Sequence, residues 1–146
     1  MPYTNDHPDR MRLFPALTVL SCLVLAGCTS ATATYRIDGA DQTLSLRANQ
    51  DYFWSDVMTV GIVTARMPDC QRKIDLGKMP KADFDVEVFD SGDDIYTVRA
   101  GELLWQVNIQ TCTNLGEPTA GVAGLPVGNF KFDAEKKLVF LKAEAK

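Results

Sequence analysis

The chain has 146 residues, of which 46% are hydrophobic and 23% are charged, a composition typical of one soluble globular domain. There are 15 Lys and Arg residues against 19 Asp and Glu, and the formal net charge is -4. This balance leaves no basic excess to neutralise phosphates, so we expect no nucleic-acid partner and no electrostatic attraction to an anionic membrane.

An apolar run over residues 13–25 follows Met11-Arg12 and ends in the small residues Ala26-Gly27. A positive start, an apolar stretch and a small-residue cleavage site are the three parts of a secretory signal. The run is shorter than the roughly 20 apolar residues of a membrane-spanning helix. We therefore expect residues 1–27 to form a cleaved signal peptide. Residues 1–10 are acidic and atypical of a signal, so we expect the true start at Met11; a long n-region is the alternative.

The stretch Leu25-Ala26-Gly27-Cys28 resembles the lipobox of bacterial lipoproteins and matches it at all four positions. The resemblance implies cleavage before Cys28, a thioether-linked diacylglycerol on its sulfur, and usually a third acyl chain on its new amino group. Two or more acyl chains anchor a protein stably in a bilayer. In that family an Asp after the cysteine retains the protein at the inner membrane. Thr29 here implies the periplasmic face of the outer membrane.

The small polar residues that follow indicate a short lipidated tether over residues 28–34, with the folded domain expected over residues 35–146. Apolar and polar residues then alternate along residues 35–38 and 43–47, which predicts a hairpin. Residues 57–65 carry β-branched side chains at both parities, as expected for a strand buried on two faces.

Further along, Phe84, Val86 and Val88 alternate with acidic residues, a pattern typical of a half-buried strand. Residues 95–99 and 103–110 predict a second hairpin. The Gly- and Pro-rich residues 113–128 indicate an open loop, and short strands are expected at 130–132 and 138–141. We predict a single, mainly antiparallel β domain, a small barrel or sandwich.

Four cysteines are present, of which Cys22 leaves with the signal and Cys28 carries the lipid. The remaining pair, Cys70 and Cys112, is expected to form a structural disulfide, because exported proteins fold in an oxidising compartment. Reactive or free thiols are the alternatives, since Cys70 precedes Arg72 and Lys73.

The only histidine, His7, precedes the signal, so the mature protein contains none. Catalytic arrangements that depend on histidine, and zinc sites with histidine ligands, are therefore excluded. We expect no catalytic residue, no metal and no cofactor.

Three features could carry binding. The aromatic residues Tyr52, Phe53 and Trp54, with Trp105, could line a sugar- or peptide-binding surface, although burial in the core is the expected fate of such a cluster. The open loop over residues 113–128 could be functional or merely mobile. The acidic residues could hold calcium, although a solvated strand face is the simpler interpretation. These acidic residues are Asp83, Asp85, Glu87, Asp90, Asp93 and Asp94.

These patterns predict a membrane-anchored, non-catalytic binding or assembly module whose partner is an envelope protein or a glycan. The candidate surface residues are Tyr52, Trp54, Asp90, Asp93 and Asp94. The alternative is an inhibitor of a cell-wall lytic enzyme. Tyr35-Arg36, Asp38-Gly39 and Phe53-Trp54 resemble motifs of lipid-anchored lysozyme inhibitors, which are small disulfide-bearing β-barrels. Ile37 stands where that family commonly has a cysteine, and no inhibitory segment is recognisable.

Overall fold

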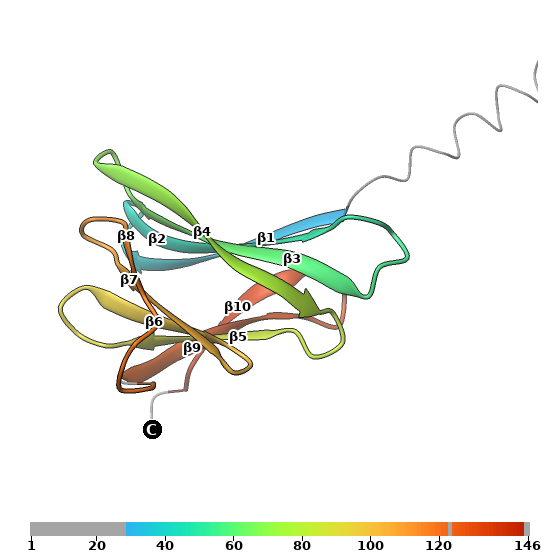
Figure 1. Ribbon diagram of the computed structural model, residues 1–146. Helices are drawn as coiled ribbons and strands as arrows, with labels where there is room; N and C mark the ends of the chain where they lie inside the picture. Colours follow the sequence, from blue (N-terminus) through green and yellow to red (C-terminus); the bar gives the residue numbers. More distant parts are fainter. Residues whose placement is uncertain (1–28, 123, 145–146) are drawn as a thin grey trace, which may run out of the picture.

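The computed structural model describes residues 29–122 and 124–144, which form two antiparallel β-sheets packed as a sandwich (Figure 1). The first sheet has the order β1-β2-β3-β4 and the second has the order β10-β9-β5-β6-β7-β8. The strands of the first sheet are β1 (Thr29–Asp38), β2 (Gln42–Gln50), β3 (Val57–Arg66) and β4 (Cys70–Pro80). Those of the second are β5 (Asp85–Asp90), β6 (Ile95–Ala100), β7 (Leu103–Asn108), β8 (Thr113–Gly116), β9 (Leu125–Phe132) and β10 (Leu138–Lys142). The predicted mainly β fold is confirmed.

The first sheet follows the alternation of apolar residues. Leu44 and Leu46 on β2 are fully buried, and β3, between β2 and β4, is buried at consecutive positions. Of the tether expected over residues 28–34, the described residues 29–34 belong to β1 instead. Thr29 already pairs with Gln50, and β1 is ordered from its first described residue. Small side chains complete the inward face, with Ala31 and Ala33 packed at the core.

The second sheet contains two strands where a loop was expected. Thr113–Gly116 pairs with β7, and β9 begins at Leu125 between β5 and β10, so only residues 117–124 connect them. Gly128 explains why a glycine-rich segment belongs in a sheet. Its φ is 155°, and a Cβ at this position would collide with the carbonyl oxygen of Leu141. The missing side chain therefore lets β10 approach β9 closely.

The two sheets meet differently along their two sides. On one side β1 lies against β10, and the Tyr35 ring stacks on Phe140 with centroids 4.6 Å apart. On the other side the edge strand β4 faces the β6–β7 turn and is held to the second sheet by the Cys70–Cys112 disulfide. The sandwich is closed on the first side and partly open on the second.

The strand directions give the sandwich two ends. We call the end at which the described chain enters β1 the entry end; it carries the β2–β3, β4–β5 and β6–β7 connections (Figure 1). The opposite, disulfide end carries the β1–β2, β3–β4, β5–β6 and β7–β8 turns. Within residues 29–122 and 124–144, we find no helix long and apolar enough to cross a membrane.

Candidate functional site

The expected disulfide is confirmed: Cys70 and Cys112 are bonded, with Cα atoms 6.0 Å apart and 42 positions apart in sequence. Cys112, in the β7–β8 turn, is buried, and Cys70 begins β4, so the bond joins the two sheets at the disulfide end. Because both sulfurs are in this bond, the alternatives of free or reactive thiols do not apply to it. The expected lipid site, Cys28, and the expected signal peptide lie outside the described residues.

The aromatic cluster of the β2–β3 loop lies on the surface, so the expected burial is wrong. Tyr52, Phe53 and Trp54 are 59%, 70% and 67% exposed. The ring centroids of Tyr52 and Trp54 are 5.1 Å apart in a stacked arrangement, and those of Phe53 and Trp54 are 4.6 Å apart edge to face. Trp105, on β7, is half-buried and packs against the core, so it does not belong to this loop cluster. The three loop residues therefore form an aromatic tip at the entry end.

The acidic residues do not gather. In the part of the chain that the structure describes, no three carboxylate or cysteine side chains lie close enough to hold a metal ion. Asp85 accepts a hydrogen bond from Asn129 Nδ2 at 2.8 Å, and Glu87 pairs with Arg99. The side chain of Asp90 accepts from the backbone N–H of Gly92 and so stabilises the β5–β6 turn.

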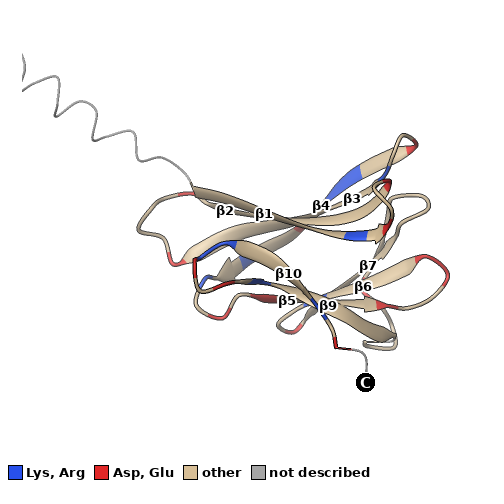
Figure 2. Cartoon of the chain, turned by 180° about the vertical axis from the view of Figure 1, so that it is seen from behind, with Lys and Arg blue, Asp and Glu red and all other residues tan. Residues whose placement is uncertain are grey.

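The candidate surface therefore divides between the two ends. Asp90, Asp93 and Asp94 lie at the β5–β6 turn of the disulfide end, away from Tyr52 and Trp54 at the entry end. Figure 2 shows acidic segments on the turns opposite the start of β1. One binding surface cannot include both groups, because the length of the sandwich separates them.

Two tyrosines lie between the sheets near Asp90. Burial raises the pKa of Tyr96 to about 12, and the negative charges of Asp90 and Asp94 add to the rise. Burial also raises the pKa of Tyr35, whose ring centroid lies 6.4 Å from that of Tyr96. Both hydroxyl groups therefore stay protonated at neutral pH, and this pair acts as part of the core.

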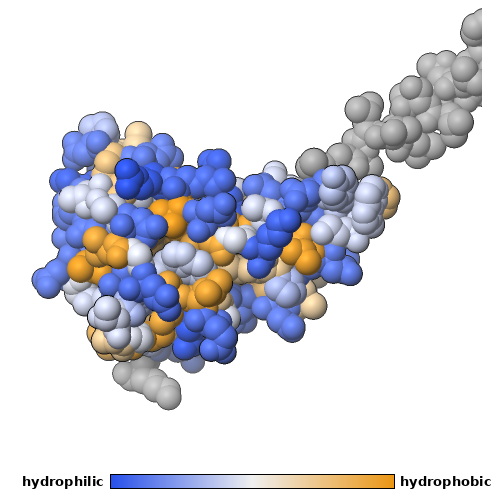
Figure 3. All heavy atoms as spheres, in the orientation of Figure 1, coloured by the Kyte–Doolittle hydropathy of each residue, from blue (hydrophilic) through white to orange (hydrophobic). Residues whose placement is uncertain are grey.

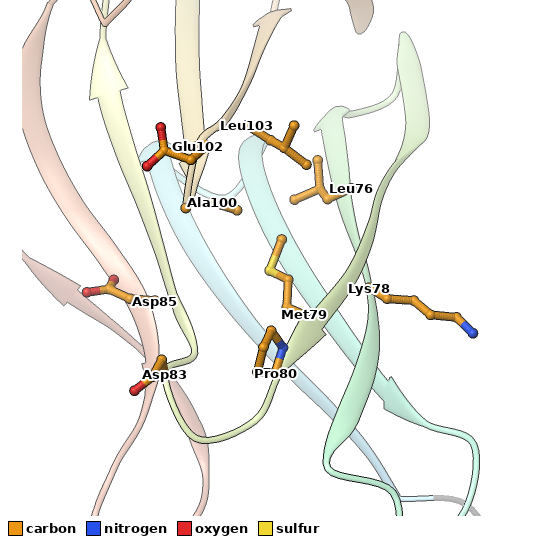
Figure 4. Close-up of a pocket in the computed structure, with 10 residues that line it drawn as sticks. Leu76, Lys78, Met79, Pro80, Asp83, Asp85, Ala100, Glu102 and Leu103 are labelled. Atoms are coloured by element: carbon orange, nitrogen blue, oxygen red, sulfur yellow. The ribbon is translucent and has the colours of Figure 1, made fainter.

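A groove of about 330 Å³ lies on the open side, between β4 and the β6–β7 turn. Leu76 and Leu103 point toward one another from opposite sheets, with Met79 and Pro80 beside them (Figure 4). Leu103 is 56% exposed because it lies at the mouth of the groove. Apolar surface follows the hollow between the two sheets in Figure 3.

The charges around this groove are mostly negative. Asp83, Asp85 and Glu102 lie on the side of the second sheet, and their carboxylates, like the amine of Lys78, are directed away from the middle of the groove and lie at its outer rim (Figure 4). An apolar floor with an acidic rim can accept an apolar side chain from a segment that also carries basic residues. The groove is therefore our candidate binding site in the described chain.

Strand addition to the free edge of β4 is disfavoured beside this groove. The β3–β4 register shifts between Val60 and Gly61, which leaves Leu76 in a bulge. Lys73, Lys78 and Pro80 also lie along this edge. Bulges, lysines and proline are the features by which natural sheets block edge-to-edge pairing. We therefore expect recognition through side chains in the groove.

Sequence reasoning missed the groove, since no local pattern indicates that Met79 and Leu103 come together across two sheets. Leu103 belongs to the same alternating pattern as Val107, which is fully buried, so the pattern does not distinguish the exposed residue from the buried one. Comparison with family models, curated proteins and solved structures finds no match to this chain. The residues that resemble lysozyme inhibitors also separate: Tyr35 packs between the sheets, whereas Phe53 and Trp54 are exposed in the aromatic tip. Inhibition of a cell-wall lytic enzyme therefore stays a prediction, because the residues that suggested it do not form one surface.

Proposed function

We propose that this protein is a non-catalytic binding or assembly module anchored by acyl chains on Cys28, on the periplasmic face of the outer membrane. The lipobox Leu25-Ala26-Gly27-Cys28 supports the anchor. The disulfide between Cys70 and Cys112 supports export, because such bonds persist in oxidising compartments. Thr29 after the lipobox cysteine supports the outer membrane.

The single observation that carries the binding function is the groove between β4 and the β6–β7 turn. It combines an apolar floor with Asp83 and Glu102 at its rim. We propose that the partner is an envelope protein that places an apolar side chain against Leu103 and basic residues against this rim. A glycan is the less favoured partner, because the floor offers aliphatic side chains rather than the flat aromatic faces that stack on sugars.

Anchoring is tested by Cys28→Ser in a bacterial host. The variant should accumulate as an unprocessed precursor without lipid, whereas the unchanged chain should be cleaved and acylated. Metabolic labelling with a fatty acid and fractionation of the envelope measure both properties. Normal cleavage and labelling of the variant would contradict the anchor.

Binding is tested by photo-crosslinking in the same cells. A photoreactive amino acid at Leu103 should form a discrete adduct with an envelope protein. The same amino acid at Leu125, 76% exposed on β9, is the matched control and should not. Asp83→Lys with Glu102→Lys should weaken the adduct, whereas Asp93→Lys with Asp94→Lys should leave it unchanged. No adduct at Leu103, or equal adducts at both positions, would contradict the groove as the binding site.

A further inference from the structure

The aromatic tip lies beside the point at which the chain enters the fold. Thr29 pairs with Gln50, the last residue of β2, and the tip begins two residues later at Tyr52. Figure 1 shows the β2–β3 loop extending from the sandwich next to the start of β1. Cys28 immediately precedes Thr29 in the sequence. A strand advances only about 3.3 Å per residue, so acyl chains on the residue before Thr29 would bring this loop close to the bilayer.

The tip exposes an unusual amount of aromatic surface. Phe53 and Trp54 are 70% and 67% exposed, and Val57 at the start of β3 is 42% exposed. Aromatic side chains bury about 150–250 Å² each when covered, so leaving neighbouring rings in water is unfavourable. Exposed apolar patches of this kind mark surfaces that another phase or molecule covers.

The loop is held in this shape from within. Gln50 is 4% exposed, and its Nε2 donates to the carbonyl oxygens of Phe53 at 3.2 Å and Ser55 at 2.6 Å. The N–H of Ser55 donates to the carbonyl oxygen of Tyr52 at 3.0 Å, and the N–H of Lys81 donates to that of Asp56 at 2.8 Å. These bonds fix the backbone while the rings point outward.

We propose that the aromatic tip inserts into the headgroup region of the bilayer that holds the acyl chains of Cys28. This inference rests on the proposed anchor and adds the orientation of the domain: the entry end faces the membrane and the disulfide end faces the periplasm. Trp and Tyr are enriched at membrane interfaces because an amphipathic ring suits the headgroup level. Because β1 begins at Thr29, an anchor on the preceding residue would hold the tip at the surface into which it inserts.

The charges around the tip indicate which class of lipid headgroup it would contact. Asp51 and Asp56 flank the rings, and Lys78 and Lys81 lie on the neighbouring strand and loop, so acidic and basic residues balance. Insertion is then driven by the rings rather than by attraction to anionic headgroups. Zwitterionic lipid should therefore suffice, and added salt should not release the tip.

The sequence supplies its own probe, because Trp54 and Trp105 are its only tryptophans. The Trp105→Phe variant leaves Trp54 as the sole reporter, and the Trp54→Phe variant leaves Trp105 as the matched control. Each full chain is expressed in a bacterial host, purified from membranes and reconstituted in phosphatidylethanolamine-phosphatidylcholine vesicles. The vesicles contain either ordinary lipid or lipid brominated near the headgroup end of its acyl chains. Mass spectrometry of each sample measures acylation at Cys28.

Brominated lipid should reduce Trp54 emission roughly twofold at both low and high salt, as expected for an interfacial ring. The emission of Trp105 should be unchanged. Acylated Cys28 with unquenched Trp54 would overturn the insertion while leaving the anchor intact, and would assign the tip to a protein or glycan partner. An unacylated Cys28 would overturn the anchor and the inference together. Equal quenching of Trp54 and Trp105 would overturn the proposed orientation.

Discussion

The two ends of the sandwich differ in what holds them and in what they expose. At the disulfide end, the Cys70–Cys112 bond joins the sheets, and Tyr35 and Tyr96 pack between them. At the entry end, Phe53 and Trp54 stand in solvent over a loop that the buried Gln50 supports. The covalent link between the sheets and the exposed aromatic surface therefore lie at opposite ends, so substitutions at the two ends should have separable effects.

Removing the disulfide should produce the largest loss of stability. Closing 42 residues of chain separation should contribute about 4 kcal/mol through the lower entropy of the unfolded state. Cys70→Ala with Cys112→Ala should therefore lower the free energy of unfolding in urea by about this amount. Reduction of the unchanged protein should have the same effect. If the double variant unfolded at the same urea concentration as the unchanged protein, the disulfide would not be what stabilises its end of the sandwich.

Alkaline pH should produce the second-largest loss of stability, through a tyrosine at the disulfide end. The pKa of Tyr96 in the folded state is about 12, above the ordinary value of 10.0, so the folded state favours the protonated hydroxyl. Its contribution is fully present below pH 10 and is lost as pH rises through about 12. Tyr96→Phe should flatten this dependence, measured as urea midpoints across that range. Tyr35→Phe provides a comparison variant that keeps Tyr96. If the urea midpoint of Tyr96→Phe fell with pH as steeply as that of the unchanged protein, Tyr96 would not be the source of the pH dependence.

Removing the support of the aromatic tip should have a smaller effect. Gln50→Ala eliminates two hydrogen bonds to the backbone carbonyls of Phe53 and Ser55, which should cost about 1–2 kcal/mol of unfolding free energy. It should also loosen the loop, which lowers the fluorescence anisotropy of Trp54 in the Trp105→Phe background. Unchanged anisotropy would show that the loop keeps its shape without Gln50.

Changing the exposed rings should affect stability least. Phe53→Ser with Trp54→Ser should alter the unfolding free energy by less than about 0.5 kcal/mol, because both side chains are mostly exposed. Circular dichroism and urea denaturation check this expectation, with Leu125→Ser as the matched change on an exposed apolar residue elsewhere. A loss as large as that from removing the disulfide would mean that the tip packs as part of the core.

Alternation and cysteine counting predicted the features that local sequence determines. Val86 and Val88 are fully buried on β5, as their alternation with acidic residues indicated. The pairing of Cys70 with Cys112 followed from the resemblance that assigned Cys28 to lipid. The start of β1 could also have been predicted from the sequence. Ala31 and Ala33 extend the alternating pattern of Tyr35 toward the N-terminus, on the inward face of the strand.

The remaining features depend on distant neighbours. Gly128 belongs to a strand because β10 approaches it, and a local reading of glycines and prolines predicted a loop. Phe53 and Trp54 were expected in the core because aromatic side chains are usually buried. Their exposure depends on β2 ending at Gln50, which residue type alone does not indicate. The groove brings Met79 and Leu103 together from different sheets, so only the assembled fold places them at one site.

The proposed lipid at Cys28 is what would bring the entry end to a membrane. Intact-mass and peptide mass spectrometry of the mature protein, extracted from envelopes, measure it directly. We expect the mature chain to begin at Cys28, with a diacylglyceryl group on its sulfur and an acyl chain on its amino group. A mature chain that begins elsewhere, or that carries an unmodified Cys28, would contradict it.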